Sequence, residues 1–216
     1  MPSLRQINRV LLEKLVATGY DIPAEELATV ESTAAFEAAY PQAANQPEVL
    51  TRVVTPLPDT AAERKAPNGL LLLFAQLEEG KKTIGKAQAR NLIETMDREN
   101  VTTAFFIVNA PLFAQARDYI RERNGRLRVV VFSYDQLSFN VSQHRRVPQH
   151  LLLSPPEAAE WLRFTKLKRS QLPRIFEDDP QARYLDATHN ELIKVVSASP
   201  TVGVFVKHLV VVRRIG

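Results

Sequence analysis

Short apolar runs alternate with amphipathic stretches in the middle of the chain. The strand-length apolar runs are 70–77, 103–108 and 127–132, and the stretches with helical spacing of apolar residues are 83–99 and 111–123. Residues 137–141 are a candidate for a fourth strand. Continuous apolar strands between helices are typical of a sheet that is buried on both faces, so this region is predicted to be an α/β domain.

Two helices are predicted before this alternation. Apolar residues recur every three or four positions in residues 2–19, and Gly19 stands where a left-handed cap would end a helix. Residues 24–40 are rich in Ala and Glu and end at a proline. Five prolines punctuate residues 41–69, which are therefore predicted to be a loop or linker around one strand, residues 49–54.

The last third of the chain has a different pattern. Ser154 and Glu157 have the spacing of a capping box, in which each side chain bonds a free backbone N–H at the start of a helix. Short helical turns are predicted near 170–185, and two strands, 191–196 and 203–212, close the chain as a hairpin. Helices followed by a hairpin indicate a small α+β domain.

Charge divides the chain at about the same place. Residues 1–141 contain 16 Lys and Arg against 17 Asp and Glu, whereas residues 142–216 contain 12 against 7. This shift predicts two domains, 1–142 and 143–216. The positive surplus of the second domain suits nucleic acid or an acidic protein surface, and it equally suits a well-solvated surface with no such partner.

Composition excludes several classes of function. The chain has no cysteine, which excludes disulfides, thiol nucleophiles and cysteine-bound zinc and fits a reducing compartment. Its four histidines include no pair at the spacing of a metal-binding helix. The longest unbroken apolar run, residues 70–75, has six residues, where a membrane span needs about 20. No basic start followed by an apolar stretch marks a secretory signal. We therefore expect no metal, no cofactor and no membrane partner.

Residues 80–87 contain a string that suggests nucleotide chemistry. Gly80 to Lys86 satisfies the pattern GxxxxGK, follows an apolar strand and precedes a helix, as a phosphate-binding loop does. However, Ala87 stands where Ser or Thr would bind Mg²⁺, and Glu78 and Glu79 would repel a triphosphate. A charged turn is the favoured interpretation, and a nucleotide-binding enzyme is the alternative.

Two further candidates favour structural roles. Residues 177–179 offer adjacent carboxylates, but neighbouring side chains point apart and Asp-Pro commonly opens a turn. Trp161 lies at helical spacing from apolar residues, so it is predicted to be a core residue rather than a stacking platform.

The last third also carries motifs that resemble a known family. In order they are Val-Pro-x-His at 147–150, Gln-Leu-Pro-Arg-Ile at 171–175, Asp-Pro at 179–180, and Ser199-Pro200-Thr201 with Gly203 in the hairpin. Their order and spacing resemble the C-terminal assembly domain of the fifth subunit shared by the three nuclear RNA polymerases, and of its archaeal counterpart. The first two thirds resemble the eukaryotic form more loosely.

The resemblance implies a non-catalytic polymerase subunit with an α/β N-terminal jaw domain followed by a small α+β C-terminal assembly domain. The assembly domain would dock on the largest subunit beside other polymerase subunits. The jaw would lie near downstream duplex DNA and make weak, non-specific phosphate contacts. The implied location is the nucleus, or the nucleolus for a copy dedicated to RNA polymerase I. The residues implied in docking are Pro148, His150, Gln171, Leu172, Pro173, Arg174, Ile175, Asp179 and Pro180, and those implied near DNA are Pro111 and Arg117.

The chain departs from the family pattern at several places. The usual glycine-rich turn before the penultimate strand is replaced by residues 186–190, and the Tyr-Arg pair near the C-terminus by residues 206–209. The Pro-Ser-Ala-Met-Lys segment of the jaw stands here as residues 111–115, with the proline but without the lysine. A paralogue that serves one polymerase class, or a prefoldin-like or viral adaptor built on the same fold, is a further alternative.

Overall fold

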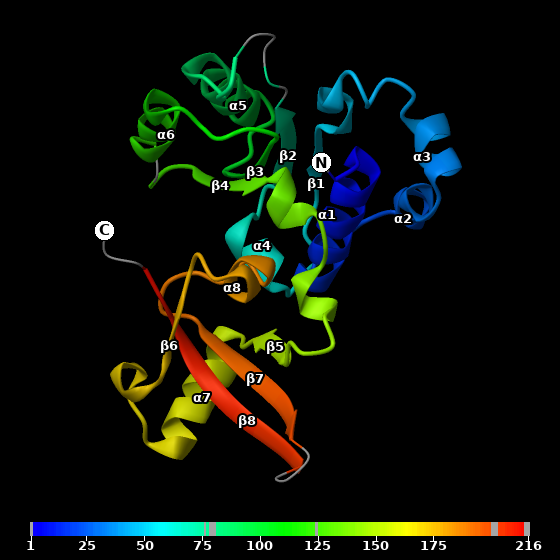
Figure 1. Cartoon of the computed structure of the whole chain (residues 1–216). Helices are drawn as coiled ribbons and strands as arrows, with labels where there is room; N and C mark the ends of the chain where they lie inside the picture. Colours follow the sequence, from blue (N-terminus) through cyan, green and yellow to red (C-terminus); the bar gives the residue numbers. More distant parts are fainter. Residues whose placement is uncertain (1, 76, 78–80, 124, 200–202, 214–216) are drawn as a thin grey trace. The chain divides into compact units, whose positions relative to one another are not determined.

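The computed structural model consists of two compact units. Unit 1 comprises residues 1–139 and unit 2 residues 140–216, where the sequence predicts a division at 142. Each unit contains its own four-stranded sheet, and Figure 1 colours both along the chain. The residues that the structure describes are 2–75, 77, 81–123, 125–199 and 203–213.

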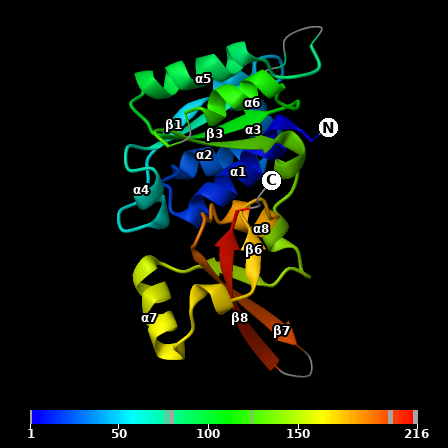
Figure 2. The ribbon, with the colours of Figure 1, turned by 90° about the vertical axis from the view of Figure 1, so that its left-hand side faces the viewer.

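Unit 1 is a sheet with helices on both faces. Its strand order is β1-β2-β3-β4, in which β2, β3 and β4 are parallel and the short β1 lies antiparallel at one edge. Helices α5 and α6 cover one face, and α1, α2 and α3 lie on the other (Figure 2). The bounds are α1 Leu4–Thr18, α2 Ala24–Glu31, α3 Thr33–Ala39, η1 Pro47–Leu50, β1 Arg52–Val54, α4 Ala61–Lys65, β2 Leu70–Ala75, α5 Lys86–Arg98, β3 Thr103–Val108, α6 Ala114–Arg121, β4 Arg128–Ser133 and η2 Tyr134–Leu137.

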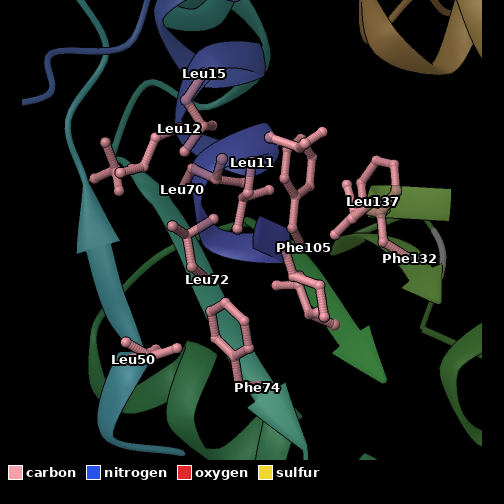
Figure 3. Close-up of a cluster of buried hydrophobic side chains, with 14 of the residues drawn as sticks. Leu11, Leu12, Leu15, Leu50, Leu70, Leu72, Phe74, Phe105, Phe132 and Leu137 are labelled. Carbon is pink, nitrogen blue, oxygen red and sulfur yellow. The ribbon is translucent and has the colours of Figure 1, made fainter. Parts of the chain in front are cut away.

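The core of unit 1 lies on both sides of its two central strands. All six residues of β2 and all six of β3 are buried. On one face Leu72 and Phe105 pack against Leu11 of α1 (Figure 3). On the other face Leu71 packs in the cluster that contains Met96 of α5. Burial on both faces explains why these strands are continuous apolar runs rather than alternating ones.

Unit 2 is a second sheet, ordered β5-β7-β8-β6. The β7–β8 hairpin forms its centre, with β5 antiparallel to β7 at one edge and β6 parallel to β8 at the other. Side chains of one face pack with Ala182 of α8, and those of the other face with Ala158 of α7. The bounds are η3 Val141–Gln143, β5 Gln149–Leu152, α7 Pro155–Thr165, η4 Arg169–Gln171, β6 Arg174–Phe176, α8 Pro180–Tyr184, β7 Leu192–Ser199 and β8 Gly203–Val212.

Local capping signals are confirmed in both units. Helix α1 ends at Gly19, which has a φ of 93°, and a Cβ there would lie 2.7 Å from the Cβ of Thr60. Only glycine fits this position without strain. At the start of α7 the Ser154 N–H donates to Glu157 Oε2 over 2.8 Å, and the Ser154 hydroxyl accepts from the Glu157 N–H. The capping box that the sequence predicts is therefore present.

Other elements differ from those that the sequence predicts. Residues 24–40 are two helices rather than one, because Ser32 adopts extended backbone and its hydroxyl caps α3. Residues 137–141 form no strand, because Asn140 caps a 3-10 turn through the Ser142 N–H. Only residues 52–54 of the predicted strand 49–54 form a strand, since Pro47 opens a 3-10 turn that continues to Leu50. Elements α4, β5 and β6 are absent from the prediction.

Candidate functional site

The side chains of segment 171–176 in unit 2 lie partly in the interior and partly at the surface. The sequence predicts a turn there, whereas residues 174–176 form β6, with Ile175 beside Val211 of β8. Leu172 and Ile175 are buried in clusters on opposite faces of the sheet. Gln171, Pro173 and Arg174 are exposed. The strand replaces the expected turn because the Pro173 carbonyl accepts the Val210 N–H over 2.9 Å, which starts a parallel ladder.

The other residues implied in docking do not join this segment. Pro148 and His150 lie at β5, the opposite edge of the sheet, where His150 Nδ1 is 2.7 Å from the Pro148 carbonyl oxygen. Asp179 caps α8 by accepting the Gln181 N–H over 2.8 Å, and Pro180 occupies the first turn of that helix. The nine residues therefore form separate patches, of which residues 171–175 are the longest.

Carboxylates 177–179 have structural partners. Glu177 accepts the His189 N–H over 2.5 Å and the Arg213 Nε over 3.2 Å, and Asp179 caps α8. Trp161 packs against the cluster around Val210, and its ring also stacks on His208, with centroids 3.9 Å apart. Among the described residues no group of three His, Asp or Glu could hold a metal ion, and no described helix has the length and hydropathy of a membrane span.

In unit 1 the structure brings two separate candidates together. The Ile84 N–H donates to the Pro111 carbonyl over 3.0 Å, and the Phe113 N–H donates to the Ile84 carbonyl over 2.9 Å. The loops that precede α5 and α6 are thus tied side by side. Because this bridge holds residues 111–113 extended, α6 begins at Ala114 rather than at the proline.

The described part of the glycine-lysine string, residues 81–86, leads into helix α5. Gly80, with Glu78 and Glu79, lies outside the described residues. Gly85 is the N-cap of α5, and its N–H is bonded by the Gln88 side chain over 3.1 Å. The Lys86 ammonium group lies 5.4 Å from the centroid of the Tyr119 ring, over a helix rather than over the loop.

An aromatic ring that contacts two cations links α5 to α6. Tyr119 has Lys86 on α5 as one neighbour and the guanidinium of Arg123, 3.7 Å from its ring centroid, as the other. Such cation–π contacts hold cationic side chains in place. Arg117, which the resemblance places near DNA, instead donates from Nε and Nη2 to the Leu112 carbonyl, at 3.2 and 3.1 Å. The spacing of Tyr119 and Arg123 is readable in the sequence, but the approach of Lys86 is not.

The near-zero net charge of unit 1 results from opposite net charges in its two helical layers. Residues 1–80, which include α1, α2 and α3, contain 6 Lys and Arg against 11 Asp and Glu. Residues 81–126, which include α5 and α6, contain 9 against 5. The exposed cations of this second layer are Lys81, Lys82, Lys86, Arg90, Arg98, Arg117, Arg121 and Arg126. The layer of α5 and α6, called the basic layer below, can attract polyanions despite the balance of the whole unit.

Comparison with known proteins supplies relatives for both parts of the chain. The family described as RNA polymerase Rpb5, C-terminal domain, matches residues 139–211. DNA-directed RNA polymerases I, II, and III subunit RPABC1 of Caenorhabditis elegans is 30% identical over 129 residues, which is 60% of this chain and 61% of the relative. The Dictyostelium discoideum protein of the same name is 29% identical over 127 residues, 58% of this chain and 64% of the relative.

An archaeal relative is more similar over a shorter stretch. DNA-directed RNA polymerase subunit Rpo5 of Thermofilum pendens is 43% identical over 75 residues, which is 35% of this chain but 94% of the relative. By contrast, the chain spans less than two thirds of the length of the eukaryotic relatives.

Proposed function

The chain belongs to the Rpb5 family of RNA polymerase subunits, and from that premise we propose that it is a non-catalytic subunit of a nuclear DNA-directed RNA polymerase. In this role unit 2 docks on the largest subunit, and unit 1 forms part of the lower jaw near downstream DNA. The chain serves the assembly through its surfaces rather than through a reaction of its own, so a nucleotide-binding enzyme is not retained as an alternative.

The extent of the archaeal match is the main support for assigning docking to unit 2. A relative that is itself named an RNA polymerase subunit is matched over 94% of its length by 75 residues. That is nearly the size of unit 2, residues 140–216, in which almost all of the family match lies. Since a protein of about this size is a polymerase subunit in its own right, unit 2 is the part of the chain that we assign to assembly.

The outer side of segment 171–176 suits a protein partner. Leu172 and Ile175 hold the segment in the core, whereas Pro173, Arg174 and Phe176 are exposed on or beside the edge strand β6. Arginine and aromatic side chains are enriched at protein interfaces. We assign docking on the largest subunit to these exposed residues.

Co-purification of the tagged full chain from nuclear extract tests this assignment. We expect recovery of the largest subunit with the wild-type chain and reduced recovery with Arg174→Glu, whereas Arg145→Glu, an exposed control in the same unit, has no effect. Absence of polymerase subunits from the wild-type sample would refute the proposed function. Recovery of one largest subunit rather than three would identify a class-specific paralogue, with a nucleolar location if that subunit belongs to RNA polymerase I.

The basic layer of unit 1 supports proximity to DNA. Lys86 and Arg90 are one helical turn apart on α5 and therefore share a side of the helix. Arg123, just after α6, contacts the same Tyr119 ring as Lys86, so cations from both helical segments gather at one ring. We propose that these side chains, rather than the start of α6, meet DNA phosphates. Phosphate contacts of this kind carry no sequence information and weaken with salt.

Binding of the full chain to a short DNA duplex, followed by fluorescence anisotropy over a series of salt concentrations, tests this surface. We expect Lys86→Glu with Arg90→Glu to weaken binding and to lower the salt slope by about 0.9 for each phosphate that is no longer neutralised. Arg64→Glu, an exposed control in α4, leaves both unchanged. We expect a smaller loss for Arg117→Glu, because that guanidinium is bonded to its own backbone. Equal losses for all three variants would exclude a defined surface.

A further inference from the structure

The central hairpin of unit 2 is longer than the strands beside it. Strands β7 and β8 pair from Leu192 with Val210 out to Ser199 with Gly203. Strand β6 pairs with β8 only over residues 210–212 (Figure 1). Over the described residues, no strand therefore pairs with β8 between Gly203 and His208 on the side away from β7. We call this part of the strand the outer edge.

The backbone of the outer edge has a defined polarity. The Val211 N–H and carbonyl bond to Glu191 and Asn190, on the side of β7, whereas the Val210 N–H bonds to Pro173, on the side of β6. Backbone groups of an antiparallel strand alternate between its two neighbours. The N–H and carbonyl groups of residues 204, 206 and 208 must then point to the side of β6, beyond the point where β6 ends.

Three consecutive side chains of the outer edge are apolar and exposed, and they are followed by Lys207 and His208. Val204, Phe205 and Val206 are 69%, 52% and 42% exposed. Soluble proteins usually guard an open strand with charged residues or proline, because an unguarded strand pairs with another chain. The apolar run includes residue 206, the first of the segment in which the sequence departs from the family pattern. The outer edge therefore has both the backbone and the side chains of a strand that takes a partner.

Charge indicates what kind of partner fits. The chain has no Asp or Glu after Glu191, whereas Lys194 and Lys207 lie on the hairpin itself. A second copy of this chain would bring like charges together, and DNA would leave the three apolar side chains without a favourable contact. A segment that combines apolar side chains with a carboxylate can pack against the valines and pair with a lysine of the hairpin.

We propose that the outer edge of β8 accepts an extended segment of another polymerase subunit by strand addition, the segment having alternate apolar side chains and a carboxylate opposite Lys207. In strand addition, main-chain hydrogen bonds supply affinity and the alternate side chains supply specificity. The proposal rests on the proposed function, and the outer edge continues the same side of the sheet as β6, the strand that we assign to docking.

Amide hydrogen exchange on the full chain, free and in the purified polymerase assembly, tests the proposal. We expect exchange at the N–H groups of Val204, Val206 and His208 to slow at least tenfold in the assembly. The N–H groups of Phe205 and Lys207 point toward β7 and are an internal control with little change. Full polymerase recovery without slower exchange at the first three positions would overturn the proposal and leave the proposed function intact.

Lysines introduced on the outer edge give an independent test. We expect Val204→Lys with Val206→Lys to lower recovery of a polymerase subunit severalfold, because the new lysines oppose pairing of the edge. Val49→Lys, at a valine 46% exposed in unit 1, is the matched control, and equal thermal unfolding of all chains excludes misfolding. Unchanged recovery with the double variant contradicts the proposal, as does protection of the outer edge by a second copy of the chain or by duplex DNA alone.

Discussion

Neighbouring residues around β6 have opposite environments. Ile175 is 8% exposed, whereas Pro173 and Arg174, which come just before it, lie at the surface. The same five-residue motif thus combines residues that hold unit 2 together with residues that are available to a partner. Substitutions within it should separate into these two kinds.

We expect Ile175→Asp to unfold unit 2, since burial of a carboxylate without a partner lowers the free energy of unfolding by about 3 kcal/mol or more. Pro173→Ala keeps the carbonyl that bonds Val210 and should cost about 1 kcal/mol, mainly by increasing the freedom of the unfolded chain. Arg174→Asp is the exposed control for added charge. Denaturant unfolding of the full chain measures all three, and equal small effects would place the segment on the surface throughout.

Tyr134 predicts a dependence of stability on alkaline pH. Burial raises the pKa of its phenol from 10.0 to about 12. Between these two values the unfolded chain loses the proton and the folded chain keeps it, so the contribution of Tyr134 to stability, complete below pH 10, is lost as the pH rises to about 12. Tyr134→Phe should remove this part of the pH dependence, measured by denaturant unfolding. An unchanged profile would show that the phenol titrates normally in the folded chain.

At the scale of elements, α7 depends on its first turn. Ser154 and Glu157 bond each other's backbone and side chain, and these hydrogen bonds lower the pKa of Glu157. The carboxylate form is therefore favoured in the folded chain. Its stabilisation is present above the ordinary carboxyl pKa and is lost as the pH falls through the lowered value.

We expect Ser154→Ala to destabilise unit 2 by about 1 kcal/mol, the usual cost of losing an N-cap side chain. The variant should also be less sensitive to acid, because Glu157 no longer accepts the Ser154 hydroxyl and keeps only the backbone N–H of residue 154. Thermal unfolding at neutral and acidic pH measures both effects. Ser170→Ala, a serine in η4, is the control, and a loss of similar size there would contradict the capping role.

The elements that the sequence predicts are those whose signal is local. The apolar run 103–108 is β3 residue for residue, and Gly19 ends α1. Strand β6 is not predictable in this way, because three residues after a proline carry too short a pattern and its pairing partner lies 36 residues away. The break at Ser32 is also missed, since serine caps a helix only where the backbone is extended.

The candidate surfaces follow the same rule. The motif 171–175 can be found in the sequence, but only the sheet shows that its second and fifth residues are internal. The contact of Lys86 with Tyr119 joins two helices, and the pairing of Ile84 with Leu112 joins two loops. Neither has a local signal, because both depend on how the parallel strands place their following segments at one edge.

At the scale of the molecule, the two units have separate cores. The clusters around Leu11 and Met96 belong to unit 1, whereas those around Ile193 and Val210 belong to unit 2. Each sheet is also complete within its own unit. A chain organised in this way should tolerate division at the boundary.

We expect residues 140–216, expressed alone, to unfold cooperatively and to co-purify with the largest polymerase subunit. Residues 1–139 should fold as well but should not recover that subunit. Circular dichroism during thermal unfolding checks the first expectation, and identification of co-purified subunits checks the second. Recovery by the 1–139 fragment alone would reverse the roles that we assign to the two units.

The stack of Trp161 on His208 gives the protein an optical reporter. Trp161 is the one tryptophan of the chain, and the aromatic residues of unit 1 are Phe and Tyr. Emission that is excited selectively in the indole therefore comes from unit 2. The indole belongs to α7 and the imidazole to β8, with ring planes 24° apart. Partial burial lowers the pKa of His208, and the positive charge of Lys194 lowers it further. The lowered pKa favours the neutral imidazole at physiological pH. Movement of the hairpin against its helix should therefore change the emission without any added label.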